Sequence, residues 1–166
     1  QKLNTVVPKF DDKVSYKIKT KDKIDTLQLN ITRKCNLSCK HCHVSCNPNR
    51  SEDMSYDVAR RALELLESYD FTTVDITGGA PEMSGVFKYL VNGASRLNKK
   101  VMIRSNLTIY NNENYNDIPE FLRENKVDII ASLPFYEKSK TDKMRGIGAV
   151  SYTHLTLPTN REVEFS

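Results

Sequence analysis

The sequence predicts an α/β fold in which about four parallel strands form a sheet with helices on its outside, as one part of a (β/α) barrel. Two observations predict it. Segments with the apolar pattern of a strand alternate with segments of helical spacing, an order typical of parallel sheets with right-handed crossovers. In addition, the cysteine-rich, glycine-rich and polar residues follow the strands directly, at the carboxyl edge where such folds carry their active sites.

The expected strands are short. The first alternates apolar and polar residues from Thr26 to Ile31, which is the period of a strand, and a cysteine-rich loop follows it. The other three end at polar or glycine-rich residues. The four strands are expected at residues 26–31, 74–76, 101–103 and 127–131.

Three helices are expected between these strands. The first begins after Ser55, a residue type favoured at the helix N-cap, and carries Val58, Ala62, Leu65 and Leu66 at helical spacing. The charged stretch at 137–140 is expected to be solvated rather than part of the core. The helices are expected at residues 56–68, 86–97 and 118–122.

Composition and charge exclude several classes of protein. The chain has 166 residues, of which 39% are apolar and 28% charged, which fits one globular domain. The net charge of +4 comes with lysines spread along the chain, so no nucleic-acid partner is expected. No apolar run approaches the ~20 residues of a membrane span and no signal peptide is visible, so no membrane partner is expected either. Three of the four cysteines cluster, which favours metal binding in a reducing compartment, and we expect a cytoplasmic location.

The chain divides into three segments. Residues 1–23 are polar and basic and are expected to form an N-terminal leader, and residues 24–149 carry the strand and helix pattern of the core. Residues 150–166 show neither the helical nor the strand periodicity of apolar residues and are expected to be a non-native or disordered tail. Since four strands cannot close a barrel and the chain begins at Gln1, we expect it to hold the first half of a longer protein.

The cysteine motif carries the chemistry. Cys35, Cys39 and Cys42 lie at spacings of four and three, directly after the first strand. Soft thiolate ligands select iron–sulfur clusters or zinc over harder metals. Three thiolates on one tight loop can hold three corners of a [4Fe–4S] cluster and leave the fourth iron open to a substrate.

Two alternatives remain open at this loop. A zinc site is one, with His41, His43 or Cys46 as the fourth ligand, although structural zinc sites usually take a second ligand pair from further along the chain. Cys46 itself is left over from the three-cysteine motif. It is either a free thiol on a polar loop or a soft contact for a substrate in the same pocket.

The second motif is Gly78-Gly79, at the end of the second strand. Two glycines allow the backbone to approach a ligand closely and to adopt positive φ angles. Ala80 and Pro81 follow, and then Glu82, whose carboxylate is available for an acidic role. The alternative is a plain turn between a strand and a helix.

Together the Cys-x3-Cys-x2-Cys loop and the Gly-Gly turn resemble the signature of the radical S-adenosylmethionine (radical SAM) superfamily of enzymes. The resemblance implies that the open iron chelates the amino and carboxylate groups of SAM. The reduced cluster then cleaves SAM to methionine and a 5′-deoxyadenosyl radical, and an external reductant such as flavodoxin or ferredoxin supplies the electron. It also implies that His41 lies beside the adenine and that Gly78 and Gly79 hydrogen-bond the SAM ammonium group.

The same resemblance implies further cofactor contacts at the strand ends. By the family pattern, Arg104, Ser105 and Asn106 contact the SAM carboxylate or ribose, and Ser132 binds the ribose hydroxyls. The family's usual turn is Gly-Gly-Glu-Pro, so Ala80 leaves open whether Glu82 takes over the acidic role. For each residue the alternative is a polar side chain in a turn whose hydrogen bonds are all made within the protein. Arg145, with Gly146 and Gly148, is a weaker candidate for a loop near the cofactor, and no catalytic residue is assigned.

The variant Gly-Gly-Ala-Pro-Glu at 78–82 is similar to the arsenosugar-biosynthesis subgroup of the superfamily, over about residues 25–148. That resemblance implies a small-molecule substrate and transfer of the 5′-deoxyadenosyl group to dimethylated arsenic(III). Two other functions remain open, a radical SAM maturase that acts on a peptide and a non-catalytic metal-binding module on the same loop. The chain alone is also expected to lack part of the SAM site, because later strands carry the rest.

Overall fold

A computed structural model of the chain describes residues 23–132 and 138–146. The leader expected over 1–23, apart from Lys23, and the tail expected over 150–166 lie outside the described residues, as does Gly148. In the part of the chain that the structure describes, no helix is both long and apolar enough to cross a membrane.

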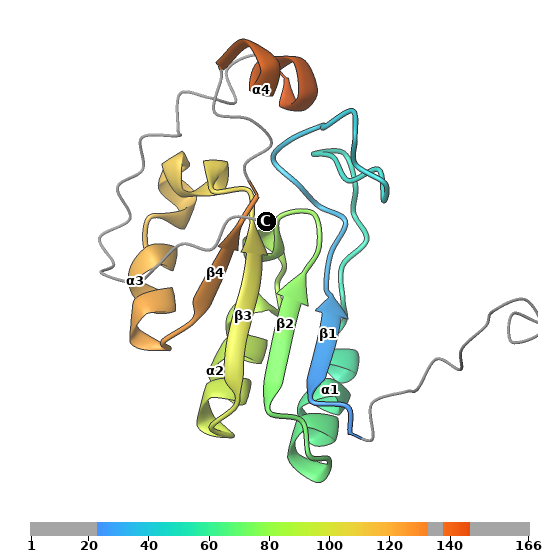
Figure 1. Ribbon diagram of the computed structural model, residues 1–166, viewed down its shortest axis with the longest axis vertical. Coiled ribbons are helices and arrows are strands. Elements are labelled where there is room, and N and C mark those ends of the chain that lie inside the picture. The colour runs from blue at the N-terminus through green and yellow to red at the C-terminus, as the bar shows by residue number, and fades with distance from the viewer. Residues whose placement is uncertain (1–22, 133–137, 147–166) are drawn as a thin grey trace, which may run out of the picture.

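Four parallel strands form one open sheet, which confirms the predicted fold class (Figure 1). The strands lie in chain order and each pairs only with its sequence neighbours, so their carboxyl ends meet at one edge. At that edge Asn30 pairs with Thr77, and Ser105 pairs with Ala131. The strands are β1 (Thr26–Asn30), β2 (Thr73–Thr77), β3 (Lys100–Ser105) and β4 (Asp128–Ala131).

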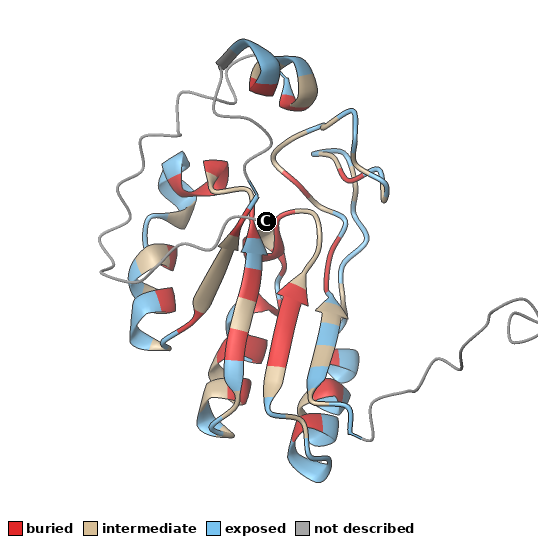
Figure 2. Ribbon diagram, in the orientation of Figure 1, coloured by how far each residue is buried: buried red, intermediate tan, exposed pale blue. Residues whose placement is uncertain are grey.

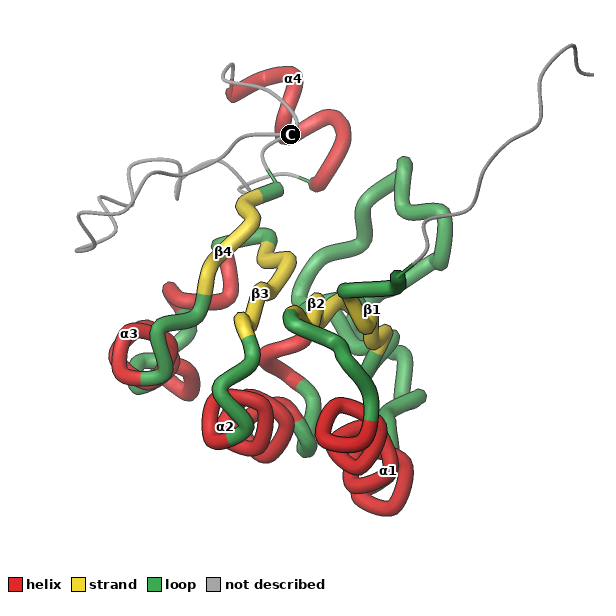
Figure 3. Tube along the Cα trace, turned by 60° about the horizontal axis from the view of Figure 1, so that its bottom comes forward, coloured by secondary structure: helices red, strands yellow, loops and turns green. Residues whose placement is uncertain are grey.

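Three helices connect the strands and cover one face of the sheet (Figure 3). They are α1 (Tyr56–Ser68), α2 (Phe87–Arg96) and α3 (Ile118–Glu124). A fourth helix that we did not expect, α4 (Lys138–Arg145), lies beyond the carboxyl ends of the strands (Figure 1). It includes most of the stretch expected to be only solvated charge. Short 3-10 turns occupy Pro81–Met83, Thr108–Asn111 and Glu113–Tyr115.

The core lies between the sheet and helices α1 to α3, and β2 is buried along its middle (Figure 2). Ser55 is the N-cap of α1, as predicted, and its hydroxyl accepts a hydrogen bond from the Val58 N–H at 3.4 Å. The expected buried face of α1 is partly wrong, because Val58 and Leu65 are exposed. The helix buries Ala59, which was not expected, together with Ala62 and Leu66, which were. Small residues at the first two positions let α1 lie close to the sheet.

Candidate functional site

A cavity of about 290 Å³ lies at the carboxyl edge of the sheet. Four parts of the chain line it: the cysteine loop (residues 35–46), the turn after β2, the ends of β3 and β4, and the last residue of α4. The lining residues are Cys35, Leu37, Cys39, His41, Cys42, His43, Val44, Cys46, Thr77, Gly78, Gly79, Arg104, Ser105, Asn106, Ile130, Ala131, Ser132 and Arg145. Of the site residues predicted from the sequence, all except Glu82 therefore reach one cavity.

The cysteine loop is shaped by its own backbone. The Cys42 N–H donates to the Cys39 carbonyl at 3.1 Å, and the Ser45 N–H donates to the Cys42 carbonyl at 3.1 Å. Ser45 adopts a left-handed conformation with φ of 53°, which turns the chain back. As a result all four cysteines line the cavity, and all four are free thiols.

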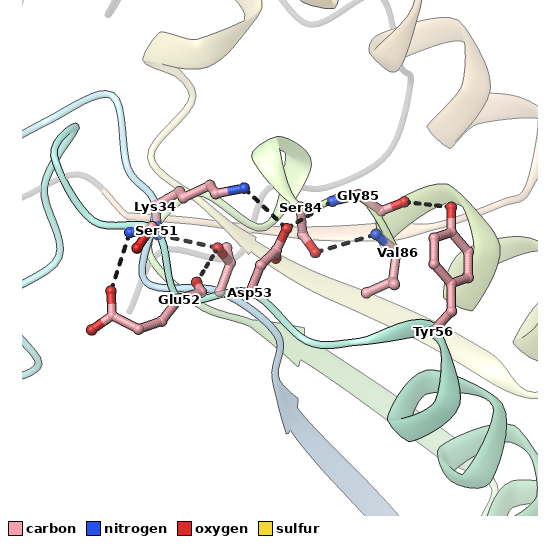
Figure 4. Close-up of polar contacts among 9 residues, drawn as sticks. Lys34, Ser51, Glu52, Asp53, Tyr56, Ser84, Gly85 and Val86 are labelled. Atoms are coloured by element: carbon pink, nitrogen blue, oxygen red, sulfur yellow. Dashed lines mark hydrogen bonds and ion pairs between the residues drawn. The ribbon is translucent and has the colours of Figure 1, made fainter.

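Polar contacts anchor the base of this loop to the turn before α2 (Figure 4). Asp53 Oδ2 accepts hydrogen bonds from Lys34 Nζ and from the Gly85 N–H, both at 3.2 Å. On the far side of the same turn the Tyr56 hydroxyl donates to the Gly85 carbonyl at 3.0 Å. Lys34, the residue before Cys35, is thus tied through Asp53 to Gly85, 51 residues later in the chain.

Burial controls the protonation of the thiols. It raises the pKa of Cys35, although the backbone N–H of Leu37 acts in the opposite direction. It also raises the pKa of Cys39, against the nearby positive charge of Arg145. Burial together with the neighbouring thiol Cys42 raises the pKa of Cys46 to about 11. These thiols are therefore protonated at neutral pH in the metal-free chain, and a metal must displace protons to bind them.

The donor set fits an iron–sulfur cluster better than a single ion. A tetrahedral zinc site holds its sulfur ligands about 2.3 Å from one centre. Among the described residues, no three Cys, His, Asp or Glu side chains come close enough together to hold one metal ion. The zinc alternative therefore has no preformed ligand set there. A four-iron cluster is wider, and it needs soft sulfur ligands spread around a cavity, as in this loop.

Of the two properties that glycine allows at this turn, Gly78 and Gly79 use the close approach and not the positive φ. Among the described glycines only Gly146 has a positive φ. The role of Gly78 and Gly79 is close packing against the residues that lead into the cysteine loop. A Cβ atom on Gly79 would lie 2.2 Å from the carbonyl oxygen of Lys34, and one on Gly78 would lie 2.8 Å from that of Thr32.

Glu82 lies behind the cavity wall rather than in it. It is only 4% exposed, and its Oε1 accepts hydrogen bonds from the Ser105 hydroxyl at 2.6 Å and the Tyr110 hydroxyl at 2.9 Å. Burial raises the pKa of this carboxyl group. The second oxygen, Oε2, has no hydrogen-bond partner in the described part of the chain, which favours a protonated acid. Glu82 is therefore not placed to contact a ligand in the cavity.

Arg104 reaches the cavity while paired with a buried carboxylate. Its Nη2 lies 2.9 Å from Asp75 Oδ2, and its Nε lies 3.1 Å from the same oxygen. Gln28 Nε2 also donates to that oxygen, at 2.8 Å. The Asp75 side chain is 5% exposed, whereas that of Arg104 is 46% exposed. The ion pair holds the guanidinium at the floor of the site and leaves part of it open to the cavity.

Arg145, only a weak candidate in the sequence, is the buried cation of the site. It is 5% exposed at the end of α4 rather than in a loop, and its guanidinium donates to the backbone carbonyl of Ser132 and, at 3.1 Å, to its hydroxyl. Its Nε has no hydrogen-bond partner in the described part of the chain. Desolvation lowers the pKa of Arg145 although the thiols of Cys39 and Cys35 act to raise it. A buried guanidinium with an unused donor is suited to an anionic ligand.

Comparison with known proteins agrees with this geometry. A model of the Radical SAM superfamily matches residues 29–132. The sporulation killing factor maturation protein SkfB of Bacillus subtilis (strain 168) is 35% identical over 81 residues, which cover 49% of this chain and 19% of SkfB. The antilisterial bacteriocin subtilosin biosynthesis protein AlbA of the same organism is 26% identical over 118 residues, which cover 70% of this chain and 25% of AlbA.

Solved structures share the fold. Streptococcus suis SuiB bound to the precursor peptide SuiA superposes with a TM-score of 0.61 at 20% identity, over 73% of this chain and 27% of SuiB. SuiB bound to S-adenosylmethionine gives a TM-score of 0.59 at 21% identity, over 73% of this chain and 28% of that protein. The matched regions thus span about a quarter of the length of AlbA and SuiB, and less of SkfB.

Proposed function

The chain belongs to the radical SAM superfamily, a superfamily of enzymes, and from that premise we propose that Cys35, Cys39 and Cys42 hold a [4Fe–4S] cluster beside which SAM binds. One observation carries the proposal. The three thiols of one loop share a cavity with the buried guanidinium of Arg145 and with the Gly78–Gly79 turn. When bound, the reduced cluster and SAM supply a 5′-deoxyadenosyl radical.

The protein's own part is to bind and orient SAM. Arg145 is suited to pair with the SAM carboxylate, because its charge is buried and its Nε is unused among the described residues. Ser132, held by Arg145, lies beside it. Gly78 and Gly79 line the cavity and would hold the SAM amino group in our proposal, and His41, which lines it from the cysteine loop, would lie next to the adenine.

For the substrate, we propose dimethylated arsenic(III) and arsenosugar biosynthesis. The Gly-Gly-Ala-Pro-Glu turn at 78–82 supports this, and so does Cys46, a soft fourth thiol that lines the cavity. In the net transfer, arsenic contributes the electron pair of the new arsenic–carbon bond and becomes pentavalent. Methionine leaves with the electron pair of the broken sulfonium carbon–sulfur bond. The electron that a reductant such as flavodoxin or ferredoxin supplies at the start would be returned once the arsenic–carbon bond has formed, so the net transfer consumes no electron.

A second candidate function is maturation of a peptide. The comparisons favour it, since SkfB and AlbA are named for peptide maturation or bacteriocin biosynthesis and SuiB is bound to a precursor peptide. The two proposals share the cluster and SAM and differ in the substrate that reacts with the 5′-deoxyadenosyl radical.

Anaerobic reconstitution with iron and sulfide tests the cofactors. We expect a [4Fe–4S] signal in electron paramagnetic resonance of the reduced protein that changes when SAM is added. Cys39→Ala should lose this signal, whereas Cys46→Ala, which changes a thiol of the same cavity outside the three-cysteine motif, should keep it. Stoichiometric zinc in place of iron, or a cluster indifferent to SAM, would support the metal-binding module instead.

A second assay separates the substrates. The reconstituted protein is incubated with SAM, dithionite and either dimethylarsinous acid or a bacteriocin precursor peptide, and the products are analysed by mass spectrometry. A 5′-deoxyadenosyl–arsenic product supports arsenosugar biosynthesis. Release of 5′-deoxyadenosine that depends on the peptide, with a mass change in that peptide, supports the maturase.

A further inference from the structure

Asn106, at the end of β3, contacts the cysteine loop through its side chain. Its Nδ2 lies 3.7 Å from the Sγ atom of Cys35 and donates to Asn36 Oδ1 at 2.9 Å. The distance of 3.7 Å is within the range of an N–H···S hydrogen bond because sulfur is larger than oxygen. The amide therefore reaches the first of the three cysteines directly.

The orientation of this amide is fixed by its other end. Asn106 Oδ1 accepts hydrogen bonds from the backbone N–H and the hydroxyl of Thr108, both at 2.9 Å. A backbone N–H can only donate, so the atom facing it must be the oxygen and the NH2 group must face Cys35. An asparagine amide has two N–H donors and two acceptor lone pairs. All four are used within the protein, so this side chain has none left for SAM.

A buried network supports the turn that carries Asn106. Leu107 adopts a left-handed conformation with φ of 63°, which is unfavourable for a leucine. The Ser105 hydroxyl accepts from the Leu107 N–H at 3.1 Å and donates to buried Glu82 at 2.6 Å. Asn36 closes the arrangement from the other side, where its Nδ2 donates to the Thr108 hydroxyl at 2.7 Å. The turn is therefore held in place by hydrogen bonds from both sides.

We propose that Asn106 is a positioning residue for the cluster ligand Cys35 and that its N–H···S hydrogen bond raises the reduction potential of the cluster. The inference rests on the proposed function. Hydrogen bonds to the sulfur ligands help to set the potential of iron–sulfur clusters. A donor stabilises the more negative, reduced cluster more than the oxidised one. Asn106 thus differs in role from the SAM contact that the sequence predicts.

The test is an anaerobic redox titration of the reconstituted chain, followed by electron paramagnetic resonance and carried out without SAM. Asn106→Leu removes the donor and keeps a similar volume. Asn106→Asp keeps the acceptor toward Thr108 and replaces the donor by an oxygen. Asn114→Asp is the matched control, because it adds the same charge at an exposed position of the same connection. Iron content is measured in every sample.

We expect the ratio of reduced to oxidised cluster at a fixed potential to fall about fivefold in Asn106→Leu, the size of one hydrogen bond, and further in Asn106→Asp. Asn114→Asp should match the wild type. If Asn106→Leu loses iron, the reduction potential of Asn106→Asp is compared with that of the wild type instead. Unchanged potentials in an iron-loaded Asn106 variant overturn the inference alone. A wild-type chain that takes up no cluster overturns the proposed function, and the inference with it.

Discussion

Gly79→Ala tests whether the Gly-Gly turn acts by close packing. The added Cβ would lie 2.2 Å from the Lys34 carbonyl oxygen and 2.9 Å from Cys35 Cβ. Backbone must move to relieve such contacts. Two hydrogen bonds oppose that movement, from the Gly79 N–H to the Thr32 carbonyl at 2.9 Å and from the Ala80 N–H to the Lys34 carbonyl at 2.8 Å.

The expected cost follows from these contacts. Losing both hydrogen bonds costs about 2 kcal/mol, and forcing a methyl group into a packed site costs about 1 to 3 kcal/mol. We therefore expect the free energy of unfolding to fall by about 3 to 5 kcal/mol, a large part of the ~5–15 kcal/mol typical of a domain. The shift also displaces the carbonyl next to Cys35, so iron uptake on reconstitution should fall as well.

Urea denaturation followed by circular dichroism measures the effect, and Gly85→Ala is the matched control. A Cβ on Gly85 meets only Asp53 Oδ2, at 3.9 Å, which is an ordinary contact. That variant should lie within about 1 kcal/mol of the wild type. If the two alanine variants unfold with the same free energy, the packing argument is refuted.

Three further predictions concern charged groups around the site. Arg145→Met should weaken SAM binding by roughly tenfold or more in calorimetric titrations of the reconstituted protein, since it removes a charge-assisted hydrogen bond. Arg123→Met removes one partner of an exposed ion pair and should leave SAM binding unchanged. If Arg145→Met binds SAM as tightly as the wild type does, Arg145 is excluded as the partner of the SAM carboxylate. Burial raises the pKa of Glu82, so the folded state holds this proton to higher pH than the unfolded state. The free energy of unfolding should therefore fall as pH rises above the ordinary pKa of a glutamate, and Glu82→Gln should flatten this dependence. A variant whose pH dependence has the same slope as the wild type would contradict this prediction. Partial burial raises the pKa of Asp53, but hydrogen bonds from its neighbours, among them Lys34, outweigh it and leave the pKa below its ordinary value. Asp53→Asn should cost about 1 kcal/mol near neutral pH and nothing once acid has protonated the wild-type carboxylate, and a cost that persists in acid would disprove this role.

The strands and the cysteine loop were predictable because their signals are local. The alternation from Thr26 onward reflects one partly buried face of the strand, and the N-cap at Ser55 depends only on the helix that it begins. The order of strands and helices then places their carboxyl ends at one edge, so Ser105 and Ser132 could be assigned to one site from the sequence.

The rest depends on tertiary contacts that leave no local pattern. Glu82 follows the Gly-Gly turn, as a ligand-binding carboxylate would, yet its side chain is buried against β3 and the turn that follows it. The glycines are required by the approach of the Lys34 carbonyl, 45 residues earlier than Gly79 in the chain. Helix α4 has few apolar residues, so periodicity does not reveal it. Arg145 was a weak candidate in the sequence, and its burial in the structure gives it its importance in the site.

The position of α4 has a consequence for synthesis of the protein. The Lys40 N–H donates to the Met144 carbonyl at 3.0 Å, and Arg145 lines the same cavity as Cys39. The cysteine loop is translated about 100 residues before α4, an interval of roughly 5 to 20 s at ~5–20 residues per second. During that interval the thiols of the nascent chain are more exposed to oxidants than in the folded protein. Cluster insertion into a site that includes Arg145 must therefore follow translation of α4.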